Sequence, residues 1–175
     1  MFKQLPRPRN RVRNSYRLPG GEAYRRVMEI QPGVGVDTAR LGESRAAIEA
    51  RLGPPTSQRD ARVFYHQTDP ALHIDYDPAG NVESVEIPYS GTPGREVTLA
   101  GIPLTYRPIE DVVRELAAAG YSGSRSDIGY DFAEGFSVFS MSSLQLSDID
   151  PSAADDDERL VAEGVFVASP AYLGF

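Results

Sequence analysis

Apolar residues in the first half of the chain recur with the spacing of an amphipathic helix. Ile48 and Leu52 fall on one face of a 3.6-residue repeat, and charged residues occupy the rest of the segment. Ser44 can accept a hydrogen bond from an unpaired amide of the first turn, as N-cap residues do. Gly53 and the two prolines after it end the pattern, because proline cannot continue a helix. We therefore predict a helix over residues 44–52.

Three segments after this helix alternate apolar and polar residues, as half-buried strands do. They cover residues 62–67, 71–77 and 82–87. A Pro-Ala-Gly-Asn turn within residues 77–81 joins the last two, since proline presets φ and glycine accepts a positive φ. With a four-residue loop before the second strand, Tyr65 lies opposite Ile74 and His66 lies opposite His73. The pattern predicts an antiparallel meander.

A looser version of the same pattern follows the Gly- and Pro-rich loop at residues 91–94. Pro108 suits the first turn of a helix, and Val112 and Leu116 belong to an apolar stripe that ends at Gly120. Further strands are predicted at residues 127–132, 136–141 and 160–168, and a short one at 27–30.

These patterns predict an α+β fold of two pseudo-repeated units, each with one helix packed on an antiparallel meander. The first unit covers residues 22–90 and the second covers residues 95–175. At this length the two units fit one shared globule, and their strands could form one continuous sheet. Residues 1–21 are rich in Arg, Pro and Gly, and we expect them to form a flexible basic arm.

The charge of the N-terminal segment is opposite to that of the rest of the chain. Residues 1–26 carry a net charge of +7, whereas the whole chain carries −7, so the remaining residues carry −14. An acidic surface of this kind repels nucleic acid and attracts basic proteins. We therefore expect a basic protein partner, with nucleic acid reached only through the arm.

Cysteine is absent, which excludes disulfides and thiol chemistry and suits a reducing compartment. No apolar run reaches the roughly 18 residues that predict a membrane span. The basic N-terminal residues are not followed by the apolar segment of a signal peptide. We expect a cytoplasmic protein that does not contact a membrane.

The two histidines of the chain are His66 and His73, and the predicted register places them side by side with Asp75 on the same face. Two imidazoles and a carboxylate can bind a transition metal, so a divalent-metal-dependent enzyme or sensor is one alternative. Residues 75–86 also match several positions of an EF-hand calcium loop, but strands flank them instead of helices. A hairpin turn accounts for the same residues, and no metal ligand is assigned.

No recognisable catalytic motif is present. Residues 120–123 lack the closing glycine of a nucleophile elbow, and both histidines precede them. That order excludes a hydrolase with its histidine after the nucleophile, and P-loop and HExxH motifs are also missing. We assign no catalytic residue and expect no cofactor.

Six carboxylates are concentrated between the last two predicted strands. They are Asp148, Asp150, Asp155, Asp156, Asp157 and Glu158. Mutual repulsion predicts an extended loop unless a cation or a basic partner neutralises it. The segment is longer than a hairpin needs, so we predict that it binds a partner, with a solvated loop as the alternative.

Part of the chain resembles a known kind of small module. The resemblance lies in Leu-Gly-Glu-Ser at residues 41–44, Gly-Pro-Pro at 53–55 and the Asp-Pro-Ala-Gly turn at 77–80. It is similar to the helix-plus-meander units of beta-lactamase inhibitory proteins and of small outer-membrane assembly lipoproteins. The resemblance covers residues 36–87 and, more loosely, 97–168. It implies a protein-binding scaffold without cofactor or catalytic residues, although the cysteines of both families are missing here.

The leading hypothesis is therefore a non-catalytic cytosolic binding protein, most concretely an immunity or inhibitor protein. An acidic inhibitor would attract a basic target, such as a nuclease, by charge complementarity. The alternatives are the metal-dependent protein that uses His66, His73 and Asp75, and a structural subunit that docks through the basic arm.

Overall fold

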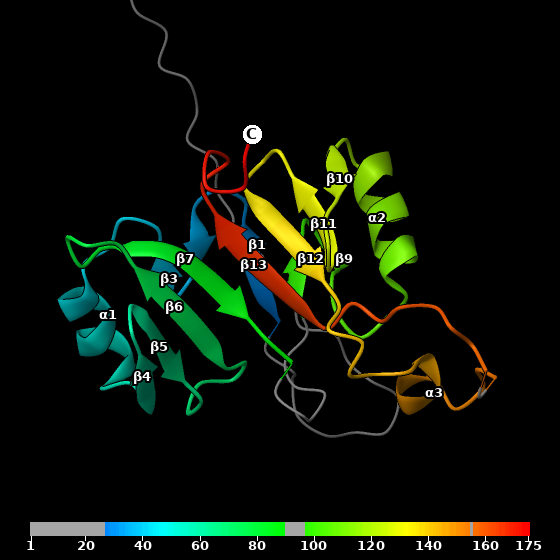
Figure 1. Ribbon diagram of the computed structural model, residues 1–175, viewed down its shortest axis with the longest axis horizontal. Coiled ribbons are helices and arrows are strands. Elements are labelled where there is room, and N and C mark those ends of the chain that lie inside the picture. The colour runs from blue at the N-terminus through cyan, green and yellow to red at the C-terminus, as the bar shows by residue number, and fades with distance from the viewer. Residues whose placement is uncertain (1–26, 90–96, 155) are drawn as a thin grey trace, which may run out of the picture.

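The computed structural model describes residues 27–89, 97–154 and 156–175. The expected arm at residues 1–21 lies outside the described residues. The fold is α+β, with its strands in two sheets and three helices in the described parts (Figure 1). In chain order the elements are β1 Met28–Gln31, β2 Gly35–Val36, β3 Ala39–Arg40, α1 Arg45–Leu52, β4 Ser57–Arg59, β5 Arg62–Tyr65, β6 Leu72–Tyr76, β7 Val82–Ile87, β8 Val97–Leu99, β9 Ile102–Pro103, α2 Ile109–Ala118, β10 Gly123–Arg125, β11 Gly129–Phe132, β12 Phe136–Phe139, α3 Leu146–Ile149 and β13 Gly164–Ala168.

The larger sheet has eight strands in the order β10-β11-β12-β13-β7-β6-β5-β4, and every neighbouring pair is antiparallel. It consists of two meanders, β4–β7 from the first half and β10–β13 from the second. The last strand of each meander, β7 or β13, lies at the centre, where Val85 is paired with Val167. Both halves of the chain therefore share this sheet.

The second sheet has five short strands in the order β3-β2-β1-β8-β9. Strands β1 and β8 are parallel, and Met28 is paired with Val97. The fold thus has two separate sheets where the sequence indicated one continuous sheet. Apart from β1, the strands of this sheet were not predicted, because segments of two or three residues are too short to show alternation.

The predicted helices form, and the first begins at the predicted cap. Ser44 Oγ accepts a hydrogen bond from the Ala47 amide at 3.3 Å, and Gly53 ends α1 with a φ of 81°. In α2, Val112 and Leu116 are buried, as the apolar stripe predicted. Local patterning therefore determines both helices.

The predicted register between the first two strands of the meander was wrong by two residues. Tyr65 is paired with Leu72 instead of Ile74, and Phe64 is paired with His73. The loop is longer than expected because the Thr68 hydroxyl donates to the Tyr65 carbonyl oxygen at 2.8 Å, which ends the strand early. A two-residue shift leaves every side chain on its predicted face, since the alternation has a period of two.

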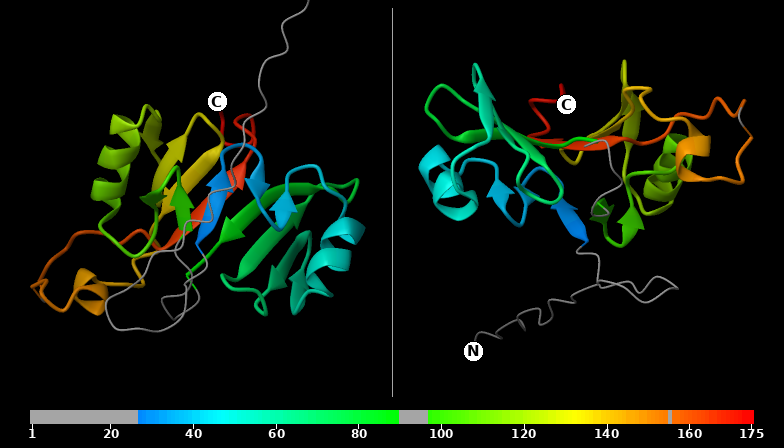
Figure 2. Two further views of the ribbon diagram at one scale, coloured as in Figure 1. Left: turned by 180° about the vertical axis from the view of Figure 1, so that it is seen from behind. Right: turned by 90° about the horizontal axis from the view of Figure 1, so that it is seen from below.

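One face of the eight-stranded sheet forms the hydrophobic core. A row of apolar side chains crosses six of its strands, and all of them are inaccessible to solvent: Val63, Ile74, Val85, Val167, Phe136 and Phe132. Figure 2 shows α1, α2 and the five-stranded sheet together on this side of the larger sheet. Buried residues from those elements, including Ile48, Ile30 and Leu116, belong to the same core cluster. The opposite face is free of these layers, and we call it the open face.

The two sheets are also tied together at two turns. The Gly33 amide donates to the Gly135 carbonyl oxygen at 3.0 Å. A Cβ on Gly135 would lie 2.7 Å from the Gly33 Cα, and Gly135 has a φ of 95°, so both contact and conformation require glycine there. None of the helices in the described segments is long and apolar enough to span a membrane.

The pairing of β7 with β13 predicts that both halves unfold together. Val85→Thr keeps the side-chain shape but buries a hydroxyl in the apolar face, which should cost about 1–3 kcal/mol. Urea unfolding followed by NMR signals of Ile74 and Val138 should show one shared transition at lower urea. Glu83→Thr, an exposed position on the same strand, is the control and should change the stability by less than about 0.5 kcal/mol. Separate transitions for the two signals would contradict a shared sheet.

Candidate functional site

A row of mostly polar and aromatic side chains crosses all eight strands on the open face. Strand register places these residues next to one another across the sheet: Ser57, Phe64, His73, Glu86, Phe166, Ser137, Asp131 and Ser124. Because side chains alternate between the faces of a strand, the whole row lies opposite the buried apolar row. Both halves of the chain therefore contribute to the open face, and Ser137 within the row is buried, at 7% exposed.

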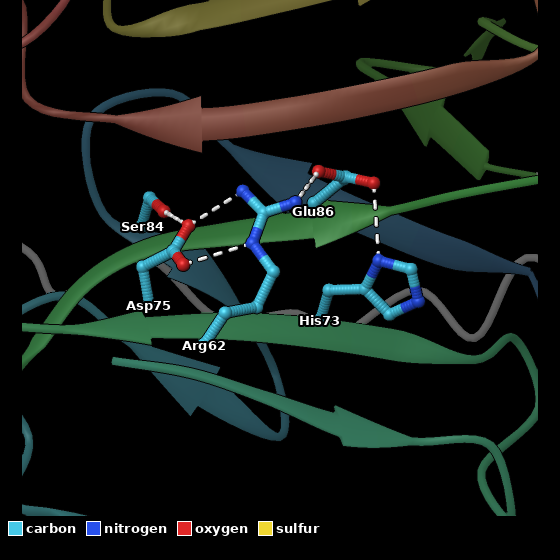
Figure 3. Close-up of polar contacts among 5 residues, drawn as sticks. All are labelled: Arg62, His73, Asp75, Ser84 and Glu86. Atoms are coloured by element: carbon cyan, nitrogen blue, oxygen red, sulfur yellow. Dashed lines mark hydrogen bonds and ion pairs between the residues drawn. The ribbon is translucent and has the colours of Figure 1, made fainter. Parts of the chain in front are cut away.

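Arg62 lies at the centre of an ion cluster on this face (Figure 3). Its guanidinium donates to both carboxylate oxygens of Asp75, at 2.9 and 2.7 Å, and to Glu86 Oε2 at 2.9 Å. The Ser84 hydroxyl donates to Asp75 Oδ2 at 2.8 Å, and His73 Nδ1 lies 3.1 Å from Glu86 Oε1. Each carboxylate therefore has two partners, and the guanidinium is fixed between them by hydrogen bonds of good geometry.

The cluster favours the charged forms of both carboxylates. Burial raises the pKa of Asp75, but hydrogen bonds from Arg62 and Ser84 outweigh burial and hold that pKa below its usual value. Burial also raises the pKa of Glu86, and the contacts with His73 and Arg62 again lower it overall. The pKa of Arg62 is raised, chiefly by its hydrogen bond to Asp75. At neutral pH the open face therefore presents a fixed arrangement of charges.

Aromatic rings surround the ion cluster. The Phe64 ring packs against His73 edge to face, with centroids 4.7 Å apart, and His66 lies 5.8 Å from Phe64. On the other side, the rings of Phe166 and Tyr172 are 5.7 Å apart. The C-terminal segment that carries Tyr172 lies on the open side of the sheet (Figure 2), where the Tyr172 side chain is 49% exposed.

The three predicted metal-ligand candidates, His66, His73 and Asp75, lie on the open face. Two of them, His73 and Asp75, are hydrogen-bonded to other residues there. His66 and His73 are not paired across the strands, although their ring centroids are 5.7 Å apart. Asp75 is held by Arg62 and Ser84, and His73 contacts Glu86. Within residues 27–89, 97–154 and 156–175, no group of three or more His, Asp or Glu side chains is placed to hold a metal ion.

The calcium-loop pattern of residues 75–86 corresponds to the hairpin between β6 and β7. Asp77 Oδ1 accepts a hydrogen bond from the Asn81 amide at 2.8 Å, and Gly80 has a φ of 82°. Glu86 lies in β7 within the Arg62 cluster. Asp77 thus stabilises the hairpin, whereas Asp75 and Glu86, the carboxylates at the two ends of the pattern, belong to the ion cluster.

The acidic segment forms local structure instead of the extended loop that repulsion predicts. Asp148 belongs to the short helix α3, where it accepts a hydrogen bond from the Gln145 amide at 2.7 Å. Asp150 accepts from the hydroxyl of Ser152 at 2.6 Å, and Asp157 forms an ion pair of 2.7 Å with Arg159.

The remaining acidic candidates lie on the surface or outside the described chain. Asp156 and Glu158 are exposed. Asp155 lies outside the described residues. The local hydrogen bonds and the ion pair explain how a segment with so many carboxylates can turn, because donors in the segment offset part of the repulsion.

Sequence reasoning missed the central residue of the open face, Arg62. The signal was present, because Arg62 and Asp75 have opposite charges and lie on the outward face of adjacent strands. The two-residue error in register hid it by placing His66, and not Phe64, across from His73. Phe166 was hidden for a different reason: its partner across the sheet, Glu86, is 80 residues earlier, and no local pattern reports such pairing.

Comparison of the chain with protein-family models, with curated proteins and with solved structures found no match. The open face provides fixed charges flanked by the half-buried rings of Phe64 and Phe166 and the exposed ring of Tyr172.

The Arg62 cluster predicts a pH-dependent contribution to stability. Because the folded-state pKa values of Asp75 and Glu86 are lowered, the contribution is present above their unfolded values and is lost as the pH falls through the folded values. Arg62→Gln should destabilise the protein by about 1–3 kcal/mol at pH 7, less than for a fully buried pair because Arg62 is 36% exposed.

Urea unfolding at pH 7 and at a pH below the lowered folded-state pKa values of Asp75 and Glu86 measures this effect, since both carboxylates are then protonated. At the lower pH, the difference in free energy of unfolding between Arg62→Gln and the unchanged protein should shrink to a small fraction of its value at pH 7. Arg59 is paired with Arg62 across β4 and β5, so Arg59→Gln is the matched control. It should change the free energy of unfolding little at either pH. An equal loss of stability at both pH values would show that the cluster does not act through charge.

Proposed function

We propose that the protein is a non-catalytic binding module that contacts a protein partner through the open face of the eight-stranded sheet. The observation that carries this proposal is the row of open-face residues across all eight strands. Apart from the C-terminal segment that carries Tyr172, no helix or second sheet of the described residues covers that side (Figure 2). Surfaces of this size and continuity suit protein contacts better than small ligands, which favour concave pockets.

The composition of the open face supports the same proposal. Aromatic residues and arginine are the side chains that most often dominate the energy of protein interfaces. Phe64 packs against His73 of the Arg62 cluster, Phe166 packs against Tyr172, and the exposed Phe175 follows on the C-terminal segment. The ion pairs of Arg62 fix its guanidinium before binding, so little side-chain entropy would be lost in a complex.

We further propose that the partner is basic, as an inhibitor or immunity protein of acidic character would require, and that binding takes place in the cytosol. The residues after position 26 carry a net charge of −14. Such a surface increases the rate of encounter with a basic protein at low ionic strength. The exposed carboxylates of Asp156 and Glu158 would add to the long-range attraction of a basic partner.

We also propose that the two halves are related copies of one unit. Each half begins with short strands of the smaller sheet, continues with a helix and ends with a four-stranded meander. The last strand of each meander lies at the centre of the large sheet. An origin by duplication would account for this order and for the contribution of both copies to one face.

A pull-down with the immobilised full chain tests the proposed binding face. The unchanged protein should retain a stoichiometric partner that elutes with salt, whereas Phe64→Ala and Tyr172→Ala should each weaken binding by about 10- to 30-fold, as truncation of an interface hot spot does.

Arg114→Ala is the control, because Arg114 is 70% exposed on α2, which covers the other face of the sheet. Thermal unfolding of each variant checks that the fold is kept. Recovery of no stoichiometric partner, or equal binding by the open-face variants and the unchanged protein, would refute the proposal.

A further inference from the structure

Three exposed apolar side chains surround a hollow at the end of β11 and β12, away from the open face. Ile128, Met141 and Leu160 are 50%, 61% and 40% exposed. The hollow has a volume of about 170 Å³ and is also lined by Ile109 and Glu110 at the start of α2. Single exposed apolar residues are common, but a group of them around one hollow marks a contact surface.

A second hollow continues from the first toward the acidic segment. Ser142 and Leu160 line both hollows, so together they form one groove. The far part is lined by Asp156, Asp157, Glu158 and Arg159. Arg159 is paired with Asp157, which leaves the exposed Asp156 and Glu158 to make this end of the groove acidic.

A buried carboxylate fixes the wall between the two ends. Glu163 is 1% exposed and accepts hydrogen bonds from the amides of Met141, Ser143 and Leu144, at 3.2, 2.6 and 2.9 Å. Between them, Ser142 has a φ of 56°, a conformation that is uncommon for residues other than glycine. Burial of a carboxylate is costly unless hydrogen bonds satisfy it. Here the backbone amides of residues 141–144 satisfy it, and the same hydrogen bonds fix the backbone of Met141, whose side chain is exposed. The groove is therefore shaped before any partner arrives.

The polar rim of the apolar end is also ordered. The Tyr130 phenol lies 3.0 Å from both carboxylate oxygens of Glu110. Asp127 and the exposed Arg125 line the same hollow, so its rim carries charges of both signs. The groove thus offers an apolar centre, a rim of mixed charge and an acidic far end, and the far end would repel an acidic peptide or a nucleic acid backbone.

We propose that this groove binds an extended segment of a partner protein in which a large apolar side chain is followed, within a few residues, by Arg or Lys. The apolar side chain would occupy the space between Ile128, Met141 and Leu160. The basic side chains would then reach Asp156 and Glu158, since the two hollows are continuous. The distribution of apolar and acidic residues along the groove determines which side chains this segment needs and that they lie within a few residues of each other.

The groove is a different surface from the open face, so the two proposals can fail independently. Tyr130 and Val138 are paired in the row that faces the helices, whereas the open-face row contains Asp131 and Ser137. A groove variant should therefore leave binding at the open face unchanged, and an open-face variant should leave the groove unchanged.

Fluorescence anisotropy with labelled peptides and the full chain tests the proposal. The first probe is a seven-residue peptide with one leucine followed by an Arg-Lys-Arg run. The second replaces the leucine with serine, and the third replaces the basic run with glutamates. The first peptide should bind at least about 10-fold more tightly than either of the others, because each lacks half of the complementarity.

Two variants locate the binding site. Leu160→Asp should weaken binding of the first peptide by at least about 10-fold, whereas Val34→Asp should not, although Val34 and Leu160 are equally exposed, at 41% and 40%. NMR shifts of the amides at Ile128, Met141 and Glu158 should follow the peptide concentration. Phe64→Ala should have no effect on this binding.

Three results would overturn the proposal. The first is equal affinity for all three peptides, and the second is an unchanged affinity in Leu160→Asp. The third is tighter binding of a peptide of residues 1–26 than of the first probe at the same amides, which would make the basic segment of this chain the occupant in place of a partner.

Discussion

The antiparallel pairing of β7 with β13 is the interaction on which the rest of the molecule depends. Glu86 pairs with Phe166 and Val85 pairs with Val167 across this junction. It joins two meanders from distant parts of the chain into one sheet, whose buried face forms a core shared by both halves. Without it, each half would have a four-stranded sheet with an exposed edge, which is prone to unwanted pairing. The open face is continuous only because this junction forms.

Alternation along the central strands separates the core from the open face. In β13, Val165 and Val167 are fully buried, while Phe166 between them points to the open face. The same alternation in β6 places Ile74 in the core and His73 on the open face. Substitutions at the exposed positions of the open face can therefore change the proposed binding surface at limited cost to the core. The Arg62 cluster is the exception, because its charges contribute to stability as well as to the surface.

Sequence patterns predicted the parts of the fold that depend on local chemistry. Ser44 marked the start of α1, and the Pro-Ala-Gly-Asn turn marked the hairpin between β6 and β7. Patterns could not predict pairings between distant strands, such as β7 with β13 or β1 with β8, because no local residue encodes them. The candidate site shows the same limit: the face of His73 was predicted, but its neighbours Phe64 and Phe166 depend on loop length and long-range register.

Native-state hydrogen exchange of the full chain tests the central claim that one sheet unites the two halves. If β7 and β13 join the meanders, the amides of Val85 and Val167 should exchange only through global unfolding, with the same free energy as core amides of β6 and β12. Equal free energies in both halves would support one cooperative sheet and one continuous open face. Exchange of β10–β12 at a clearly lower free energy than β5–β7 would show that the halves open separately, which would contradict the account.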